Sequence, residues 1–184
     1  MSQSIYKNVT NSFQLELPEC DTLDDYLDKI LPKVIKWNEP LSNLSFLNKR
    51  WLEIRDDDEF KDNILHIFCT DNEYLISIEG NILKGNWRTL NDENTLIFDM
   101  GGRKELYDCV FNNSDFLILK KHGNQHRKGM NKYFFLANES KVGNKDWQDL
   151  IQQLYNLYSN NTKFMIYLAI FIVVVLIFVY FSFL

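Results

Sequence analysis

YLISIEGNILKGNWRTL, residues 74–90, is the stretch that decides the predicted fold. Two apolar segments flank Gly80 and Asn81, a pair with glycine first that is typical of a type I′ or II′ hairpin turn. In the second segment, alternation places Leu83 and Trp87 on one face of a strand and the polar side chains on the other. The stretch therefore predicts an antiparallel β-hairpin with one buried face.

The same pattern continues on both sides of this hairpin. Eight strands are predicted, over residues 51–55, 64–69, 74–79, 82–90, 95–100, 104–111, 116–121 and 133–138. Most of the links between them are short and rich in Asn, Asp and Gly, as tight turns require. Parallel crossovers need a dozen or more residues each, so we expect antiparallel pairing. The sequence thus predicts a mainly β protein, built on an eight-stranded up-and-down barrel with flanking helices.

Large apolar side chains recur at the positions that we expect to face the barrel interior. These candidates for core or ligand-lining residues are Trp51, Leu83, Trp87, Leu96, Phe98 and Met100. An eight-stranded barrel is just wide enough to be filled by its own side chains or to hold one small ligand. The pattern alone leaves both alternatives open.

A family resemblance rests on several of these segments. The chain resembles the lipocalin-like β-barrel domains of small bacterial proteins over about residues 46–139. The segments that carry the resemblance are FLNKRWLEI, KGNWRTLNDENTLIFD, DFLILKK and KYFFLANE. In that family a Trp starts the first strand and a G-x-W closes a central one, places taken here by Trp51 and by Gly85–Asn86–Trp87. The resemblance implies a barrel that can hold a small apolar ligand, and it brings no catalytic residues.

Two helices are expected beside the barrel. One starts after Thr22, whose hydroxyl can cap it, with Asp25 three residues on, and Pro32 should kink or divide it. The other is expected over residues 144–159, with Asn144 as its N-cap. The expected organisation is an N-terminal extension (1–45), the barrel (46–139), a helix with a short linker (140–163) and a C-terminal anchor (164–184).

The anchor is expected because FMIYLAIFIVVVLIFVYFSFL, residues 164–184, contains no charged residue. As a helix it would span roughly 31 Å, about the thickness of the hydrocarbon core of a bilayer. We therefore expect a single-pass transmembrane tail anchor. The nearby positive charges, at Lys141, Lys145 and Lys163, precede it, so the barrel is expected on the cytoplasmic side, at a bacterial inner membrane.

Two surfaces are candidates for contacts outside the barrel. The predicted seventh and eighth strands are apolar on both faces, so their outer side needs cover from a flanking helix or a partner. The candidate partner surface consists of Ile118, Phe135, Trp147 and Leu154. A basic cluster that could contact anionic lipid headgroups consists of Lys120, Lys121, Arg127, Lys128 and Lys132.

The sequence offers little sign of catalytic, cofactor or metal chemistry. His122 and His126 have a zinc-like spacing but flank glycine in a predicted loop, and the acidic run at residues 56–59 lacks the spacing of an EF-hand. His66 is predicted to be a hydrogen-bonded wall or core residue. Three widely spaced cysteines suit a reducing compartment. The formal charge of −5 does not suggest nucleic-acid binding.

These observations predict a non-enzymatic, tail-anchored binding or scaffold protein, without cofactor or metal. It would present a barrel at the membrane as a subunit or adaptor of a membrane complex or as a homo-oligomer. The alternative is a carrier or sensor of a small apolar ligand or lipid held in the barrel. An open cavity would favour the carrier.

Overall fold

The computed structural model describes residues 17, 19–57, 63–90, 94–123 and 131–182, without the side chains of residues 157–166, 168 and 182. The chain divides into two compact units, Pro18–Ile151 and Met1–Leu17 with Gln152–Leu184. The first unit contains the barrel. The second contains most of the C-terminal helix.

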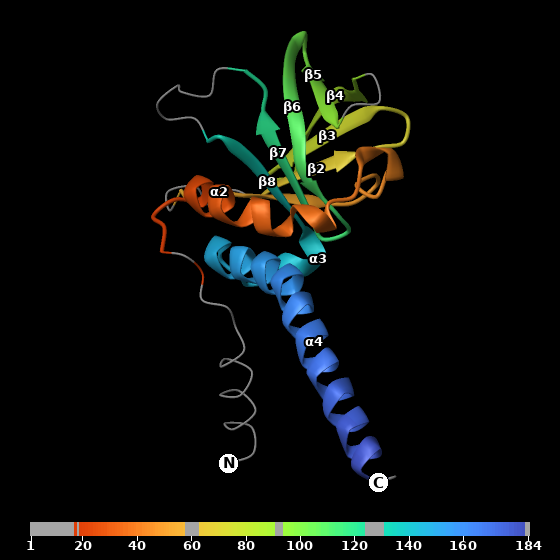
Figure 1. Cartoon of the computed structure of the whole chain (residues 1–184). Coiled ribbons are helices and arrows are strands. Elements are labelled where there is room, and N and C mark those ends of the chain that lie inside the picture. Colours follow the sequence, from red (N-terminus) through yellow and green to blue (C-terminus); the bar gives the residue numbers. More distant parts are fainter. Residues whose placement is uncertain (1–16, 18, 58–62, 91–93, 124–130, 183–184) are drawn as a thin grey trace. The chain divides into compact units, whose positions relative to one another are not determined.

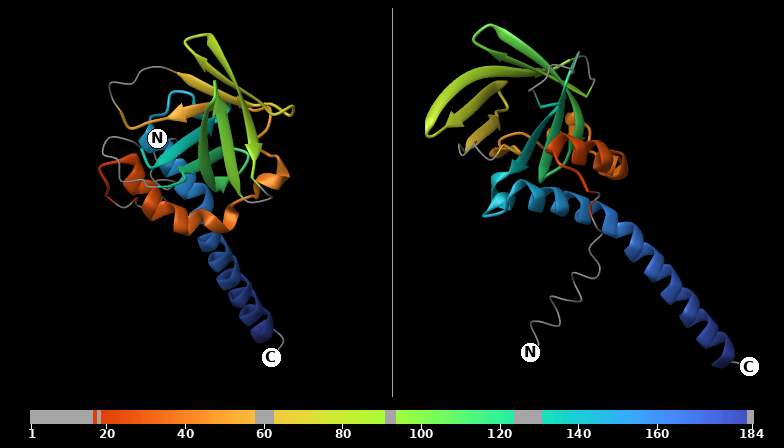
Figure 2. Two further views of the ribbon diagram at one scale, coloured as in Figure 1. Left: turned by 90° about the horizontal axis from the view of Figure 1, so that it is seen from above. Right: turned by 90° about the vertical axis from the view of Figure 1, so that its left-hand side faces the viewer.

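The barrel is closed, and its eight strands follow one another in sequence order. The strands are β1 (Trp51–Ile54), β2 (Ile64–Phe68), β3 (Glu73–Ile78), β4 (Asn81–Thr89), β5 (Thr95–Met100), β6 (Arg103–Asn112), β7 (Phe116–Lys121) and β8 (Tyr133–Asn138). Each strand pairs antiparallel with the next, and β1 pairs antiparallel with β8 to close the barrel (Figures 1 and 2). The predicted eight-stranded antiparallel barrel is confirmed.

The hairpin between β3 and β4 differs from the prediction by one residue. Ile78 pairs with Asn81, so the turn consists of Glu79 and Gly80 rather than Gly80 and Asn81. Both turn residues have positive φ, 48° at Glu79 and 85° at Gly80, as a type I′ turn requires. Glu79 accepts this conformation although glutamate rarely adopts it, and for that reason the sequence favoured the following pair.

Gly85 allows β4 and β5 to approach each other closely. A Cβ atom at this position would lie 2.6 Å from the carbonyl oxygen of Asp99 and 2.2 Å from the sulfur of Met100. Only glycine fits without a shift of the backbone. This contact explains the glycine of the G-x-W segment in terms of packing.

The helix α2 (Leu23–Val34) covers the outside of β7 and β8 (Figure 1). Thr22 caps it as predicted, and Pro32 lies in its last turn, after which the chain continues as the 3₁₀ helix η1 (Ile35–Trp37). Asp24 fixes the helix to the sheet, since its carboxylate accepts hydrogen bonds from the backbone N–H groups of Lys132 (2.7 Å) and Tyr133 (3.1 Å). The buried side of α2 consists of Leu23, Leu27, Ile30, Leu31 and Val34.

A second 3₁₀ helix, η2 (Leu41–Asn43), begins a segment that covers one end of the barrel. The indole N–H of Trp51 donates to the carbonyl of Phe46 at 2.8 Å, and the ring of Phe46 lies edge-on to those of Phe68 and Trp87. We call this end, where β1 begins and β8 finishes, the aromatic end.

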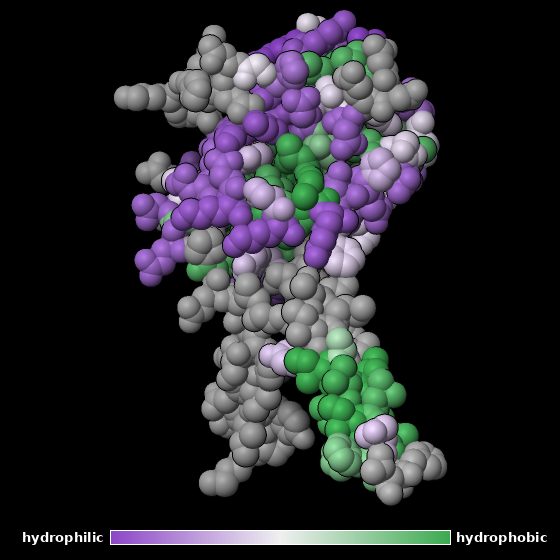
Figure 3. Space-filling view, in the orientation of Figure 1, coloured by the Kyte–Doolittle hydropathy of each residue, from purple (hydrophilic) through white to green (hydrophobic). Residues whose placement is uncertain are grey.

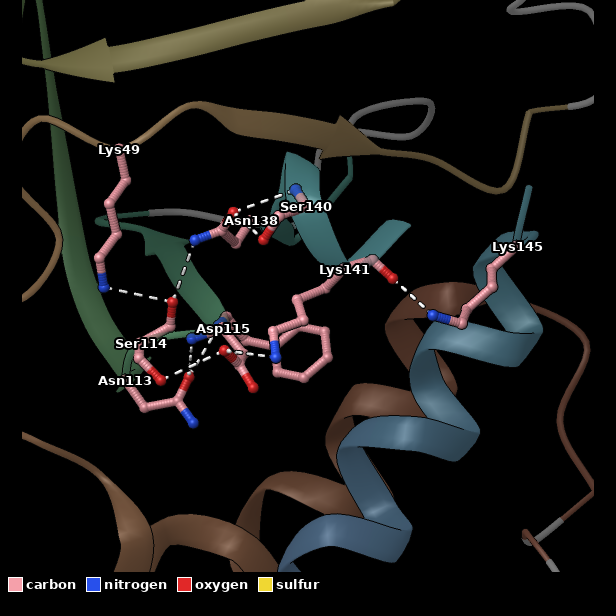
Figure 4. A network of polar contacts seen from close by, with 9 residues as sticks. Lys49, Asn113, Ser114, Asp115, Asn138, Ser140, Lys141 and Lys145 are labelled. Carbon is pink, nitrogen blue, oxygen red and sulfur yellow. Dashed lines mark hydrogen bonds and ion pairs between the residues drawn. The ribbon is translucent and has the colours of Figure 1, made fainter. Parts of the chain in front are cut away.

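Polar contacts at the aromatic end hold the turn between β6 and β7 against its neighbours (Figure 4). The carbonyl of Ser114 accepts hydrogen bonds from the amino group of Lys49 (3.2 Å) and from the amide of Asn138 (3.3 Å). Lys141, in the short helix α3 (Glu139–Val142), forms an ion pair with Asp115 at 3.7 Å. These contacts fix the point at which the chain leaves the barrel.

The last helix, α4 (Trp147–Ser182), corrects two predictions. Asp146, rather than Asn144, caps its first turn, because its carboxylate accepts from the N–H of Asp149 at 2.8 Å. The helix is also continuous through the linker that we expected before residue 164, since no Gly or Pro interrupts residues 147–182.

The predicted transmembrane helix over residues 164–184 was wrong as a separate spanning element. Within the part of the chain that the structure describes, no helix is long and apolar enough to cross a membrane.

Candidate functional site

The interior of the barrel differs between its two ends. At the aromatic end the inward side chains are almost fully buried and contact one another. This cluster contains Leu41, Phe46, Trp51, Phe68, Tyr74, Trp87, Leu96, Phe98, Cys109, Leu117, Leu119 and Leu136. Its rings occupy the space in which a large apolar ligand would have to bind.

The opposite end, where β1 finishes and β8 begins, is lined by ionisable side chains, and we call it the charged end. Its inward apolar residues Ile76, Met100, Tyr107 and Phe134 are only half-buried. Leu83 lies furthest out, with 49% of its surface exposed. Among the residues that the structure describes, the charged end is therefore the more accessible part of the interior.

A buried hydrogen-bonded chain lies just inside the charged end. The imidazole of His66 contacts the hydroxyl of Tyr74 through Nδ1 (2.7 Å) and the carboxylate of Glu53 through Nε2 (3.1 Å). An ionised carboxylate can only accept, so we infer that Nε2 of His66 carries a hydrogen and donates it to Glu53. The guanidinium of Arg55 adds an ion pair to Glu53 at 2.6 Å. His66 is thus the hydrogen-bonded core residue that the sequence predicted.

These contacts set the charge state of Glu53. Burial raises the pKa of its carboxyl, but the hydrogen bonds and charges of His66 and Arg55 outweigh burial and hold the pKa below the usual 4.5. Burial raises the pKa of the Tyr74 hydroxyl well above 10, so Tyr74 remains protonated. At neutral pH this group of hydrogen-bonded side chains therefore contains the ionised carboxylate of Glu53 and the protonated phenol of Tyr74.

Glu53 should contribute to acid unfolding. Its pKa is lower in the folded than in the unfolded chain, so its contribution to stability is complete above the unfolded value, about 4.5. That contribution is lost as the pH falls below 4.5 through the folded pKa. Urea unfolding followed between pH 7 and pH 3 should show a smaller loss of stability for Glu53→Gln than for the unchanged chain. A matched variant, Glu79→Gln in the β3–β4 turn, should follow the unchanged chain, and equal curves for all three would contradict this assignment.

A second carboxylate cluster lies beside the first. Glu105 accepts a hydrogen bond from the hydroxyl of Tyr107 at 2.8 Å and forms ion pairs with Arg103 (2.8 Å) and Lys121 (3.3 Å). Burial raises the pKa of the Glu105 carboxyl, and these partners together hold it below 4.5. The carboxylates of Glu53 and Glu105, each paired with cationic side chains, therefore lie on one wall of the charged end.

A cavity of about 410 Å³ opens at this wall. It is lined by Glu53, Ile54, Arg55, Asp57, Tyr107, Lys121, Asn131, Lys132, Tyr133, Phe134 and Phe135. Its volume falls within the range of small-molecule sites, roughly 300–1,000 Å³. The lining combines cationic groups with aromatic rings.

The candidate interior residues are placed differently from one another. Trp51, Trp87, Leu96 and Phe98 belong to the buried cluster, and Met100 packs against it half-buried. Leu83, which was predicted as a core or ligand-lining residue, is 49% exposed near the tip of the β3–β4 hairpin and so does not belong to the buried core.

Three of the four residues of the candidate partner surface are buried in the structure. Ile118 and Phe135 pair across β7 and β8 on the outer face, yet their exposed fractions are 0% and 1%. Within the first unit, α2 covers this face, so these residues cannot receive another protein while α2 is in place. Trp147 is half-buried and its ring lies edge-on to that of Tyr26, and Leu154 is fully buried.

The basic cluster is divided among acidic partners. Lys121 pairs with Glu105. The amino group of Lys132 donates hydrogen bonds to both carboxylate oxygens of Asp28, one of them at 2.7 Å. Lys120 lies near enough to Asp28 to help lower the pKa of that carboxyl. Arg127 and Lys128 lie outside the described residues. The three described lysines therefore belong to the charged end of the barrel.

Three potential metal ligands, which no spacing in the sequence indicated, meet where the β2–β3 turn enters β3. The ligand atoms of Cys69, Asp71 and Glu73 lie within 4.8 Å of one another. Lys84 pairs with Glu73 at 3.0 Å, and burial and the charge of Asp71 raise the pKa of the Cys69 thiol. Of the three groups, the Glu73 carboxylate is thus already paired with a cation in this structure. His122 instead contacts Asp108, and His126 lies outside the described residues.

The chain was compared with known families, curated proteins and solved structures. No family model matches it, and neither a curated protein nor a solved structure shows significant similarity.

Proposed function

We propose that this chain is a non-enzymatic binding protein that presents a β-barrel at a membrane, as a subunit or adaptor of a larger assembly. The observation that carries the proposal is the apolar surface of α4. Every side chain from Ile170 to Phe181 is exposed, with fractions from 42% at Val175 to 75% at Phe178 (Figure 3).

The distribution of this surface indicates what covers it. Twelve consecutive apolar residues occupy more than three helical turns, so they cover all sides of the helix rather than one stripe. A protein groove covers one stripe of an amphipathic helix, whereas lipid can surround a helix that is apolar all round. Removing these side chains from water would contribute on the order of 10 kcal/mol. We therefore propose lipid as the covering phase.

The barrel supports a binding role, and its cavity of about 410 Å³ has cationic and acidic groups in its lining rather than the purely apolar lining that a carrier of apolar ligands would need. Its sequential eight-stranded topology, with Trp51 opening β1 and Trp87 in β4, favours a lipocalin-like assignment. The aromatic end is occupied by the protein's own rings, and this weakens the alternative of a lipid carried inside the barrel.

We further propose that the barrel faces the cytoplasm. Cys20, Cys69 and Cys109 are all free, and Cys109 is buried as a small apolar residue. Free thiols persist in a reducing compartment. This arrangement would leave the charged end of the barrel available to cytoplasmic molecules.

Flotation with phosphatidylcholine vesicles tests the proposal. The full chain should float with the vesicles, while the variant Val174→Lys with Ile177→Lys should stay at the bottom of the gradient. A lysine in an apolar lipid phase costs roughly 2.5–3.5 kcal/mol, so two should largely abolish binding. Neutral lipid is used so that attraction between charges cannot supply the binding.

The control places the same two charges on exposed apolar residues of the barrel unit. Leu44→Lys with Ile82→Lys should float as the full chain does, because these side chains are already 51% and 62% exposed and lie outside α4. Equal flotation of both double variants, or no flotation of the full chain, would contradict the proposal. A stable dimer of the full chain that does not float would assign the apolar surface to a second copy instead.

A further inference from the structure

We propose that the charged end of the barrel binds a small amphipathic anion, a molecule with a carboxylate or phosphate group next to an apolar part. This site goes beyond the membrane role and does not depend on it. Three features of the charged end carry the inference: its accessibility, its two unlike walls and the way its cations are paired.

The two walls match the two parts of such a ligand. On the β3–β5 side the inward residues are apolar, and Ile76, Leu83 and Met100 remain half-buried or exposed. On the β1, β7 and β8 side, the cavity is lined by Arg55, Lys121 and Lys132. Ile76, Leu83 and Met100 are not among the described lining residues of the cavity, so the apolar tail would first contact the ring of Phe134 inside the cavity, with its anionic head against the cations.

The cations can bind an anion because Glu105, Glu53 and Asp28, the carboxylates with which they pair, each have a further donor. If Lys121 turns towards a ligand, Glu105 keeps Arg103 and the hydroxyl of Tyr107. When Lys121 turns away, the half-buried carboxylate of Glu105 still has partners. The exchange therefore avoids the cost of an unpaired buried charge.

The same holds for the other two cations. Glu53 keeps the Nε2–H of His66 when Arg55 turns away. Asp28 keeps the hydroxyl of Tyr133, which donates at 2.6 Å, when Lys132 turns away. Arg55, Lys121 and Lys132 all line the same cavity. Each can thus release the carboxylate with which it pairs and bind an anionic ligand instead.

The lining also sets the sign of the preferred ligand. Among the described residues that line the cavity, three are cationic and two, Glu53 and Asp57, are acidic. Guanidinium and ammonium groups form their strongest hydrogen bonds with carboxylate and phosphate oxygens. An organic cation would instead meet amino groups that already lie over the rings of Tyr107 and Tyr133, at 5.8 and 5.1 Å from the ring centres.

The test titrates the full chain, held in a non-ionic detergent, with octanoate, octyl phosphate and octylammonium, and follows backbone amide shifts by NMR. Saturable shifts are expected for an anion at the charged end, for example at Tyr107 and Lys121, and not for octylammonium. Tighter binding of octanoate would assign a carboxylate ligand, and tighter binding of octyl phosphate a phosphate such as a lipid headgroup. Both results support the site.

Lys121→Met should weaken anion binding by roughly tenfold or more, the contribution of a charge-assisted hydrogen bond. The matched variant is Lys84→Met, which removes a lysine that pairs with Glu73 on the outer face of β4. Lys84→Met should bind the anions as the unchanged chain does. Partition of the octyl ligands into the detergent affects the unchanged chain and both variants equally. Equal affinity of Lys121→Met and the unchanged chain at equal melting temperature would overturn the proposal. Equal shifts with octylammonium, or no saturable shift at the charged end, would overturn it as well.

Discussion

Trp87→Ala should lower the free energy of unfolding by about 3–5 kcal/mol, the usual range for truncating a large buried aromatic side chain. Trp87 is 5% exposed, and its ring lies edge-on to that of Phe46 with centres 5.2 Å apart. Its indole N–H also donates to the carbonyl of Cys69 at 2.9 Å. The truncation therefore opens a cavity at the aromatic end and leaves that carbonyl without its donor. Urea unfolding, monitored by circular dichroism, measures the loss.

The neighbouring Asn86→Ala provides the control, because Asn86 is exposed on the outer face of the same strand. It should cost less than ~0.5 kcal/mol. If the two variants unfold at the same urea concentration, the inward face of β4 is assigned to the wrong residues.

Ile118→Lys should be at least as damaging, with a loss of roughly 3 kcal/mol or more or a failure to fold. Ile118 has no exposed surface, and it lies on the outer face of β7 opposite Phe135, beneath α2. A lysine there must either lose its charge or displace α2, because a buried charge without a partner is among the most costly substitutions. Thermal unfolding measures the effect.

Ile118→Val is the matched variant, since it removes one methylene group without adding charge. It should cost about 0.5–1.5 kcal/mol. A melting temperature unchanged by Ile118→Lys would show that this face is exposed in solution, as the sequence had indicated for a partner surface.

The sequence predicts the barrel well because its information is local. Alternating apolar residues and short turns define each strand, and short links exclude parallel crossovers. The position of the β3–β4 turn was missed by one residue because Glu79 adopts a conformation that glutamate seldom takes. Leu83 follows the inward alternation, but alternation does not tell where along a strand the closed part of the barrel ends.

The candidate site was harder to predict, because its partners come from different strands. Glu53, His66 and Tyr74 meet only once β1, β2 and β3 are paired. A signal was present, since Glu53 and His66 are polar residues at inward positions next to Trp51 and Phe68. The cover of Ile118 by α2 likewise depends on Asp24 reaching the backbone of residues 132 and 133, more than a hundred residues away.

Hydrogen exchange of the full chain, with and without phosphatidylcholine vesicles, tests the central claim most directly. The account predicts that vesicles slow amide exchange over residues 170–181 and leave the strands of the barrel unchanged. Without vesicles, water surrounds this helix, and bound lipid would keep that water away from its backbone amides. Exchange over residues 170–181 that is the same with and without vesicles would contradict the proposed contact with lipid.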